Sequence, residues 1–216
     1  MRRRAAARAA GVLFLIATAA GVLSVVLLGP PGTEVTREAV LRGAASTTTG
    51  ALMVLVMAAA IAMIPPLVFP VLREHGEQPA LGYLVSRTVE VVLVIPGAVG
   101  PLMVVAAARG HLDLRTAHAL SQTYGDWGHP ASSVFFCLSV LLLNRVLFRA
   151  ALVPRLISLW AMAAVVPYLA DAVLVMFGVL SLSSPLHTVL VVPLAVNEMV
   201  LAVWLITKGF REYARA

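Results

Sequence analysis

The sequence has few charged residues and no long polar stretch. Of its 216 amino acids only 12% are Asp, Glu, Lys or Arg, whereas 61% are hydrophobic, and the mean hydropathy is +0.96. Soluble domains average about a quarter charged and about half apolar residues. The chain therefore cannot cover a water-facing surface with polar side chains. This composition excludes a soluble globular domain and predicts an integral membrane protein.

Cysteine and lysine are nearly absent, with one residue of each, Cys137 and Lys208. A single thiol cannot form an intrachain disulfide, which excludes a fold built on such bridges. The net charge of +6 comes from arginines in short clusters between long apolar runs, not from one basic stripe. That distribution argues against a nucleic-acid partner and is typical of charges that orient membrane helices.

Six continuous apolar segments dominate the chain, and each is about as long as the 17–25 residues that cross a bilayer core, or slightly longer. Continuous rather than alternating hydrophobicity favours helices. The first segment is too long for a signal peptide and lacks a cleavage motif at its end, so we expect it to remain as a span. The sequence thus predicts an all-α membrane protein, a single six-transmembrane-helix bundle over 1–216 with spans at about 11–29, 48–71, 81–107, 131–149, 156–180 and 186–207.

Lys and Arg are unevenly shared between the predicted connections. With a cytoplasmic N-terminus, eleven of them lie on the inner side and four on the outer side, with Arg87 inside the membrane. Because basic residues accumulate on the cytoplasmic side, both termini are predicted to be cytoplasmic, in a multi-pass protein of a bacterial cell membrane. The longest outer connections are expected at 30–47 and 109–130, the second with a short interfacial helix around 114–123.

Four ionisable residues, Arg87, Glu90, Asp171 and Glu198, fall inside the predicted spans, and Asn197 precedes the last of them. Each charge costs about 2.5–3.5 kcal/mol at the bilayer centre, so these side chains should face the bundle interior. A helical rise of about 1.5 Å per residue places Arg87, Glu90 and Glu198 at one depth. We therefore expect Arg87 to pair with Glu198 across a helix interface.

One arginine cannot neutralise three acids, so protonation, water, a bound cation or another partner must remove the excess negative charge. The predicted intramembrane polar cluster is either a packing device or a binding and proton-handling site. The first reading predicts an accessory or structural membrane protein, and the second a small carrier or proton-coupled transporter. An enzyme acting on a lipid is the weakest alternative because no nucleophile–base pair is recognisable, and no catalytic residue is predicted. The cluster consists of Arg87, Glu90, Asp171, Asn197 and Glu198.

Three segments carry a resemblance to a known family: LGYLVSRTVEVVLV at 81–94, LVPRLISLWAMAA at 152–164 and NEMVLAVWLITKGF at 197–210. In this order and spacing they resemble the bacterial family of domain of unknown function 4386, over roughly 8–210. The resemblance implies a six-span inner-membrane protein with no established activity. It also implies a set of recurring residues, by position Arg87, Glu90, Pro154, Arg155, Glu198, Trp204, Lys208, Gly209 and Phe210.

The predicted 109–130 connection holds several residue types that can bind zinc, but none at a tight ligand spacing. Solvated loop residues are the favoured interpretation, and neither a metal nor a cofactor is predicted. The expected partners are the lipid bilayer and a small-molecule, proton or lipid ligand. Arg145, Arg149 and Arg155 could contact anionic head groups, although topology alone explains them. The zinc candidates are His111, Asp113, His118, Asp126 and His129.

Overall fold

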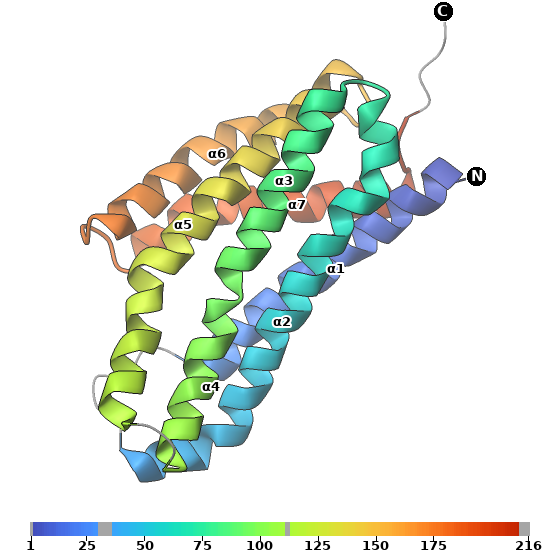
Figure 1. Ribbon diagram of the computed structural model, residues 1–216. Helices are drawn as coiled ribbons and strands as arrows, with labels where there is room; N and C mark the ends of the chain where they lie inside the picture. The colour runs from blue at the N-terminus through green and yellow to red at the C-terminus, as the bar shows by residue number, and fades with distance from the viewer. Residues whose placement is uncertain (1, 30–35, 111–112, 212–216) are drawn as a thin grey trace, which may run out of the picture.

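The computed structural model describes residues 2–29, 36–110 and 113–211. Over these residues the chain forms helices and no strand, and six helical rods are long and apolar enough to cross a membrane (Figure 1). This confirms the predicted all-α membrane fold. The helices are α1 (Arg2–Leu28), α2 (Arg37–Arg73), α3 (Glu77–Val94), α4 (Pro96–Ala108), α5 (Leu114–Arg149), α6 (Arg155–Met176) and α7 (Pro185–Thr207), with α3 and α4 forming one interrupted rod.

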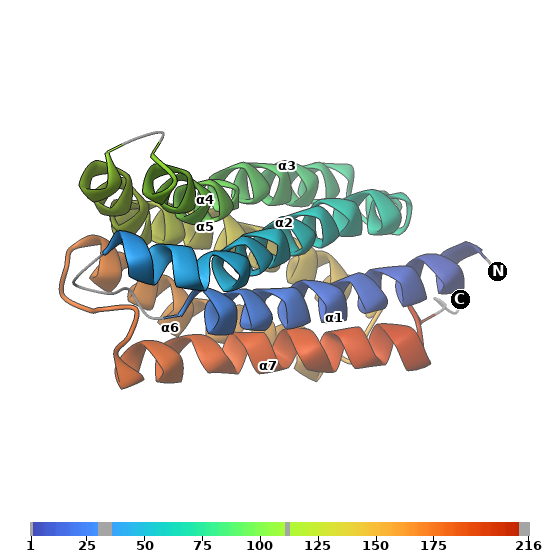
Figure 2. The ribbon, with the colours of Figure 1, turned by 90° about the horizontal axis from the view of Figure 1, so that it is seen from below.

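The six rods pack in a closed circle. Each rod has two main neighbours, in the order α7, α1, α2, α3–α4, α5 and α6, and α6 then packs against α7. Figure 2 shows α7, α1, α2 and α3 side by side in this order. Consequently α3 and α7 are not neighbours, and a contact between them has to cross the centre of the circle.

Both chain ends lie at one end of the bundle, which we call the terminal end. Gly209 lies against Arg4 and Ala7, so α7 ends beside the start of α1. Arg3 forms an ion pair with Glu74 in the α2–α3 turn. The backbone N–H of Arg211 donates to the carbonyl of Leu152 in the α5–α6 turn, at 2.8 Å. We call the opposite end, where α1, α4 and α6 finish, the distal end.

The two predicted outer loops are mostly helical, which corrects the sequence-based expectation. Thr36 caps α2, so helix covers 37–47 of the expected 30–47 loop. Asp113 caps α5, whose 36 residues run without interruption through most of the expected 109–130 loop. The predicted short helix at 114–123 is therefore the first part of a long helix. Polarity was misleading here, because one face of this helical segment carries polar side chains that line a cavity of the bundle.

Helices α2 and α5 are longer than a bilayer requires. With 37 and 36 residues they extend about 55 Å at 1.5 Å per residue, against a hydrocarbon core of about 30 Å. Figure 1 shows α2, α4 and the start of α5 continuing past α6 and α7 at the distal end. The distal half of the bundle is therefore built mainly from α1, α2, α4 and α5.

The third rod is interrupted at Ile95, between α3 and α4. Pro96 has no backbone N–H, so it cannot continue the helical hydrogen bonds across this point. The hydroxyl of Tyr124 on α5 donates to the carbonyl of Leu93 at 2.8 Å. Gly97 allows this approach, because a Cβ there would lie 2.9 Å from the Tyr124 ring. A side chain from the neighbouring helix thus satisfies a carbonyl that the interruption leaves free.

Candidate functional site

Arg87 lies at the centre of the helix circle, in the half of the bundle nearer the terminal end, and is only 2% exposed. Its Nη1 donates to both carboxylate oxygens of Glu90, one helical turn further along α3, at 3.1 Å each. Its Nη2 donates to Oε1 of Glu198 on α7, also at 3.1 Å. The expected Arg87–Glu198 contact is present, and it joins two helices that are not neighbours in the circle.

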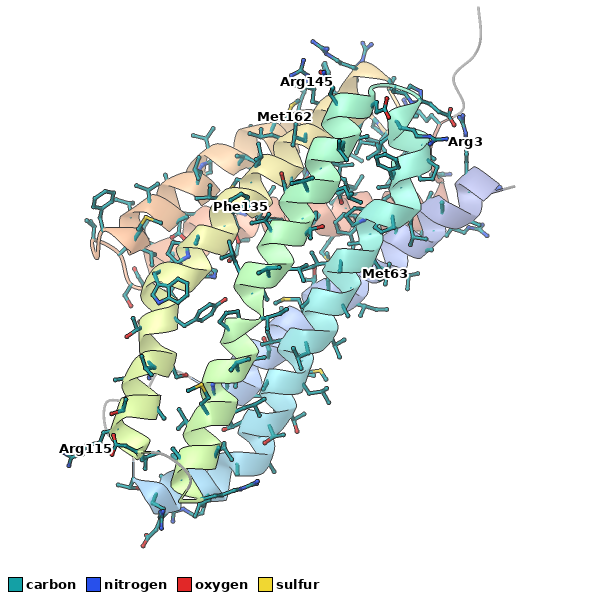
Figure 3. The ribbon with its side chains drawn as sticks, viewed as in Figure 1. Arg3, Met63, Arg115, Phe135, Arg145 and Met162 are labelled. Carbon is teal, nitrogen blue, oxygen red and sulfur yellow. The ribbon has the colours of Figure 1, made fainter. Side chains whose placement is uncertain are left out.

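Aromatic rings surround the guanidinium. The Arg87 Cζ lies 5.0 Å from the ring centroid of Phe136 on α5, 5.9 Å from that of Tyr83 on α3 and 6.0 Å from that of Phe14 on α1. Such faces attract a cation, and more strongly when water is excluded. With Glu198, four different helices contact this one side chain. Apart from the buried Asp171, most other charged side chains are peripheral, as Arg3 and Arg145 at one end and Arg115 at the other illustrate (Figure 3).

The charges of this group do not balance. One guanidinium faces two carboxyl groups, so the site has a formal charge of −1 when both acids are ionised. An uncompensated charge in a low-dielectric interior is costly, and one proton shared between the two acids removes it. The side chains differ in access, because that of Glu90 is 6% exposed and that of Glu198 is 19% exposed.

Three buried polar atoms, in Arg87 itself and in two side chains of α3 and α7 on its terminal side, lack a hydrogen-bond partner among the described residues. They are Nε of Arg87, the hydroxyl of Tyr83 and Nε1 of Trp204, all buried. Buried polar groups in proteins are almost always paired, so unpaired ones call for an explanation. Along their helices, Tyr83 and Trp204 lie between the carboxylates and the terminal end.

Asp171 does not join Arg87. Its buried carboxylate lies 2.9 Å and 3.0 Å, through its two oxygens, from Nδ1 of His187 near the start of α7. Sequence reasoning missed this histidine. The sequence contained one indication of this contact. Asp171 and His187 are equally far from residue 179 in the α6–α7 connection, so they lie at the same level when α6 and α7 pack as an antiparallel hairpin. His187 is thus the partner of one of the three buried acids that Arg87 alone cannot neutralise.

Asn197 is buried and also points away from the Arg87 group. Its Nδ2 donates to the carbonyl of Ile157 on α6, at 2.9 Å. The amide thus connects α7 to α6, whereas the adjacent Glu198 reaches toward α3. Of the five residues proposed as one cluster, the structure brings together Arg87, Glu90 and Glu198 and separates Asp171 and Asn197 from them.

The zinc candidates that the structure describes are not grouped into a metal site. Asp113 is used as the cap of α5, where it accepts the N–H of Thr116 at 2.7 Å. Hydrogen bonding to Thr116, first from its side chain and then from its backbone N–H, holds the pKa of the Asp113 carboxyl below its usual value. His111 and the side chain of Asp126 lie outside the described residues. Within the described part of the chain, no three His, Cys, Asp or Glu side chains are grouped so that they could hold a metal.

A cavity of about 500 Å³ occupies the distal half of the bundle, between α1, α2, α4 and α5. This cavity was not predicted from the sequence, because its α5 wall comes from the segment expected to be an outer connection. His129 lies in this wall, with its ring centroid 6.0 Å from that of His187. Val94 also lines the cavity, one helical turn from Glu90, which is about 6 Å along the helix. The cavity therefore ends close to the Arg87 group.

Comparison with known proteins gives one match. A family model described as Domain of unknown function (DUF4386) matches residues 9–209, nearly the whole chain. No curated protein and no solved structure matches.

Proposed function

This multi-pass membrane chain belongs to the family Domain of unknown function (DUF4386). From the residues at the centre of its bundle, we propose that it is a small proton-coupled carrier. Arg87, Glu90 and Glu198 form its proton site. The observation that carries this proposal is the imbalance of charge at the centre of the helix circle, where two buried carboxyl groups share one guanidinium.

Glu198 is the acid that exchanges the proton. Its side chain is the more exposed of the two, and it accepts one hydrogen bond from Arg87 where Glu90 accepts two. Protonation of Glu198 removes the charge that attracts Arg87. The contact between α3 and α7 then weakens, and these two helices lie on opposite sides of the circle. Gain or loss of one proton thereby changes how tightly the centre of the bundle is closed.

Access from the distal side supports the same proposal. The distal cavity ends about one helical turn from Glu90. The rod that carries Glu90 is interrupted at Ile95, in the same region. Interrupted helices near the bilayer midplane are a common feature of secondary transporters, where they surround the binding site. The interruption gives α3 and α4 a point about which they can move separately.

The terminal end is proposed to face the cytoplasm, because basic residues predominate there. Thiol labelling of intact cells tests this orientation. In a background with Cys137→Ser, a Cys placed at Gln78 in the α2–α3 region should resist a membrane-impermeant maleimide, and a Cys at Ser183 in the α6–α7 connection should react. Both positions are exposed in the structure. The reverse labelling pattern would overturn the orientation without affecting the proton site.

The proposed activity is tested by recording currents from proteoliposomes under an inward proton gradient, against a panel of uncharged and charged metabolites. At least one solute should give a current with the wild-type protein and none with Glu198→Gln. Glu77→Gln, which alters an exposed acid at the start of α3, should retain the current. Both variants should reach the membrane in normal amounts.

The alternative is an accessory protein whose buried charges only fix packing. It is favoured by the fact that Arg87 connects α3 to α7, which are not neighbours in the circle. On that reading Glu198→Gln lowers the melting temperature and the amount of protein, and no solute produces a proton-dependent current with the wild-type chain. That pair of results would replace the carrier proposal.

A further inference from the structure

The distal cavity has one polar wall, which comes from α5. The polar side chains recur along the helix at spacings of three, four or seven residues, so most of them share one helical face. In a membrane helix such a face normally points to a protein interior or a water-accessible cavity. Here it faces the cavity, and its members are His118, Ser121, Gln122, Tyr124, His129 and Ser132.

The other walls are mainly apolar, apart from the hydroxyls of Ser24 on α1 and Thr47 on α2. These walls come from Val25 and Leu28 of α1, from Val54 and Met57 of α2 and from the α3–α4 rod. No Asp, Glu, Lys or Arg is among the lining side chains in the part of the chain that the structure describes. The Arg87 site consists of charged side chains. The described residues that line the cavity are polar or apolar but carry no formal charge, apart from the titratable rings of His118 and His129.

One polar atom of this wall is without a partner. Nε2 of His129 is buried, and no described residue forms a hydrogen bond with it. By contrast, the hydroxyl of Ser132 is already used, because it donates to the carbonyl of His129 at 2.8 Å. A ligand that hydrogen-bonds Nε2 would remove the cost of leaving this atom unpaired.

We propose that the distal cavity is a binding site for an uncharged amphipathic small molecule. Its hydrogen-bonding edge lies along α5 and meets Nε2 of His129, and its apolar face lies against α1 and α2. The volume of about 500 Å³ is within the range of small-molecule pockets. An ion would find no counter-charge here and would lose its hydration, whereas a plain acyl chain would leave the polar wall unpaired.

A matched series of naphthalene derivatives tests the ligand class. Naphthol is uncharged and carries one hydroxyl, naphthalene lacks the hydrogen bond, and naphthoate and naphthyltrimethylammonium carry opposite charges. Binding to protein in lipid nanodiscs is measured by equilibrium dialysis against empty nanodiscs, which accounts for partition into lipid. Naphthol should bind saturably at one molecule per chain, and the two ions at least about tenfold more weakly. Naphthalene should bind about 3- to 10-fold more weakly than naphthol.

Three variants locate the site. Gly43 lines the cavity and a Cβ there would meet no atom within 4 Å, so Gly43→Leu should fill the space and abolish saturable binding while preserving the helix. His129→Phe should weaken naphthol binding about 3- to 10-fold and leave that of naphthalene unchanged. Ser139→Ala is the matched control on α5, because Ser139 is buried outside the cavity, and it should bind normally.

The inference does not depend on the proposed proton site, since Glu198→Gln should bind naphthol as the wild-type protein does. It is overturned if naphthol binding does not exceed that of empty nanodiscs, or if naphthoate binds as tightly as naphthol. Unchanged binding by Gly43→Leu would equally overturn it, by placing the probe elsewhere on the chain.

Discussion

The two halves of the bundle bury polar groups in opposite ways. Toward the terminal end, Arg87, Glu90 and Glu198 bring formal charges together in a packed centre lined by aromatic rings. Toward the distal end, the α5 wall presents neutral polar groups to a cavity of about 500 Å³. The Arg87 centre has charge and tight packing, whereas the distal cavity has free space and no Asp, Glu, Lys or Arg among its described lining residues.

Because of this difference, substitutions in the two regions should affect stability to different extents. Charges inside a bilayer are stable only when the protein supplies their partners, so removal of the arginine from the charged centre is expected to be costly. Neutral polar groups around a cavity can exchange partners with a ligand at low cost. The contrast predicts large effects on stability from changes in the charged centre and small ones from changes around the cavity.

The largest effect is expected for Arg87→Met. It leaves Glu90 and Glu198 buried without their counter-charge, which should cost about 3–5 kcal/mol of unfolding free energy. The measurement is SDS-induced unfolding in mixed micelles. Arg73→Met, at an exposed position at the end of α2, serves as control and should cost little. The triple variant with Glu90→Gln and Glu198→Gln should recover much of the loss, and an equally unstable triple variant would contradict the charge argument.

A smaller effect is expected for His187→Leu, about 1.5–3 kcal/mol, because the buried carboxylate of Asp171 loses its partner. The same unfolding assay measures it. The double variant Asp171→Leu and His187→Leu should be more stable than the sum of the two single changes implies. Strict additivity would show that the two side chains act independently. His75→Leu, in the α2–α3 turn, is the control histidine.

Around the cavity, Tyr124→Phe should cost about 1 kcal/mol, the ordinary net contribution of one hydrogen bond, since the carbonyl of Leu93 loses its donor. Thermal unfolding in detergent measures the change, and Thr123→Val, on the exposed face of α5, provides the control. A cost as large as that of Arg87→Met would remove the contrast between the two halves.

The smallest effect concerns the exposed cap of α5. The pKa of Asp113 is lowered by its hydrogen bond to Thr116, so its stabilising contribution is full above the carboxyl's ordinary pKa of about 3.9. That contribution disappears as the pH falls through the lowered value. Hydrogen exchange of the Thr116 amide, corrected for intrinsic rates, should increase there. Asp113→Asn, which keeps a capping oxygen but does not titrate, should abolish this pH dependence.

The sequence predicted the fold well because apolar length is a strong signal in membrane proteins. It also predicted the Arg87–Glu198 contact, since helical rise alone placed both residues at one depth. It underestimated the length of α5: 114–123 was expected to be a short helix within an outer connection, but it is the first part of α5, and several of its polar side chains line the distal cavity. From the sequence, Asp171 was grouped with Arg87. Its partner in the structure is His187, and this contact depends on how α6 and α7 pack against each other after their turn.

The contact between Arg87 and Glu198 joins residues 111 positions apart, which constrains the biogenesis of the chain. When α3 enters the bilayer during synthesis, α7 has not yet been made. Glu90, one turn away on the same helix, already neutralises Arg87, so α3 can leave the translocon as a locally neutral segment. When α7 inserts, the carboxyl group of Glu198 has to be protonated or to pair directly with Arg87. Glu90 therefore offers Arg87 a partner within α3 itself, before Glu198 of the last helix is available.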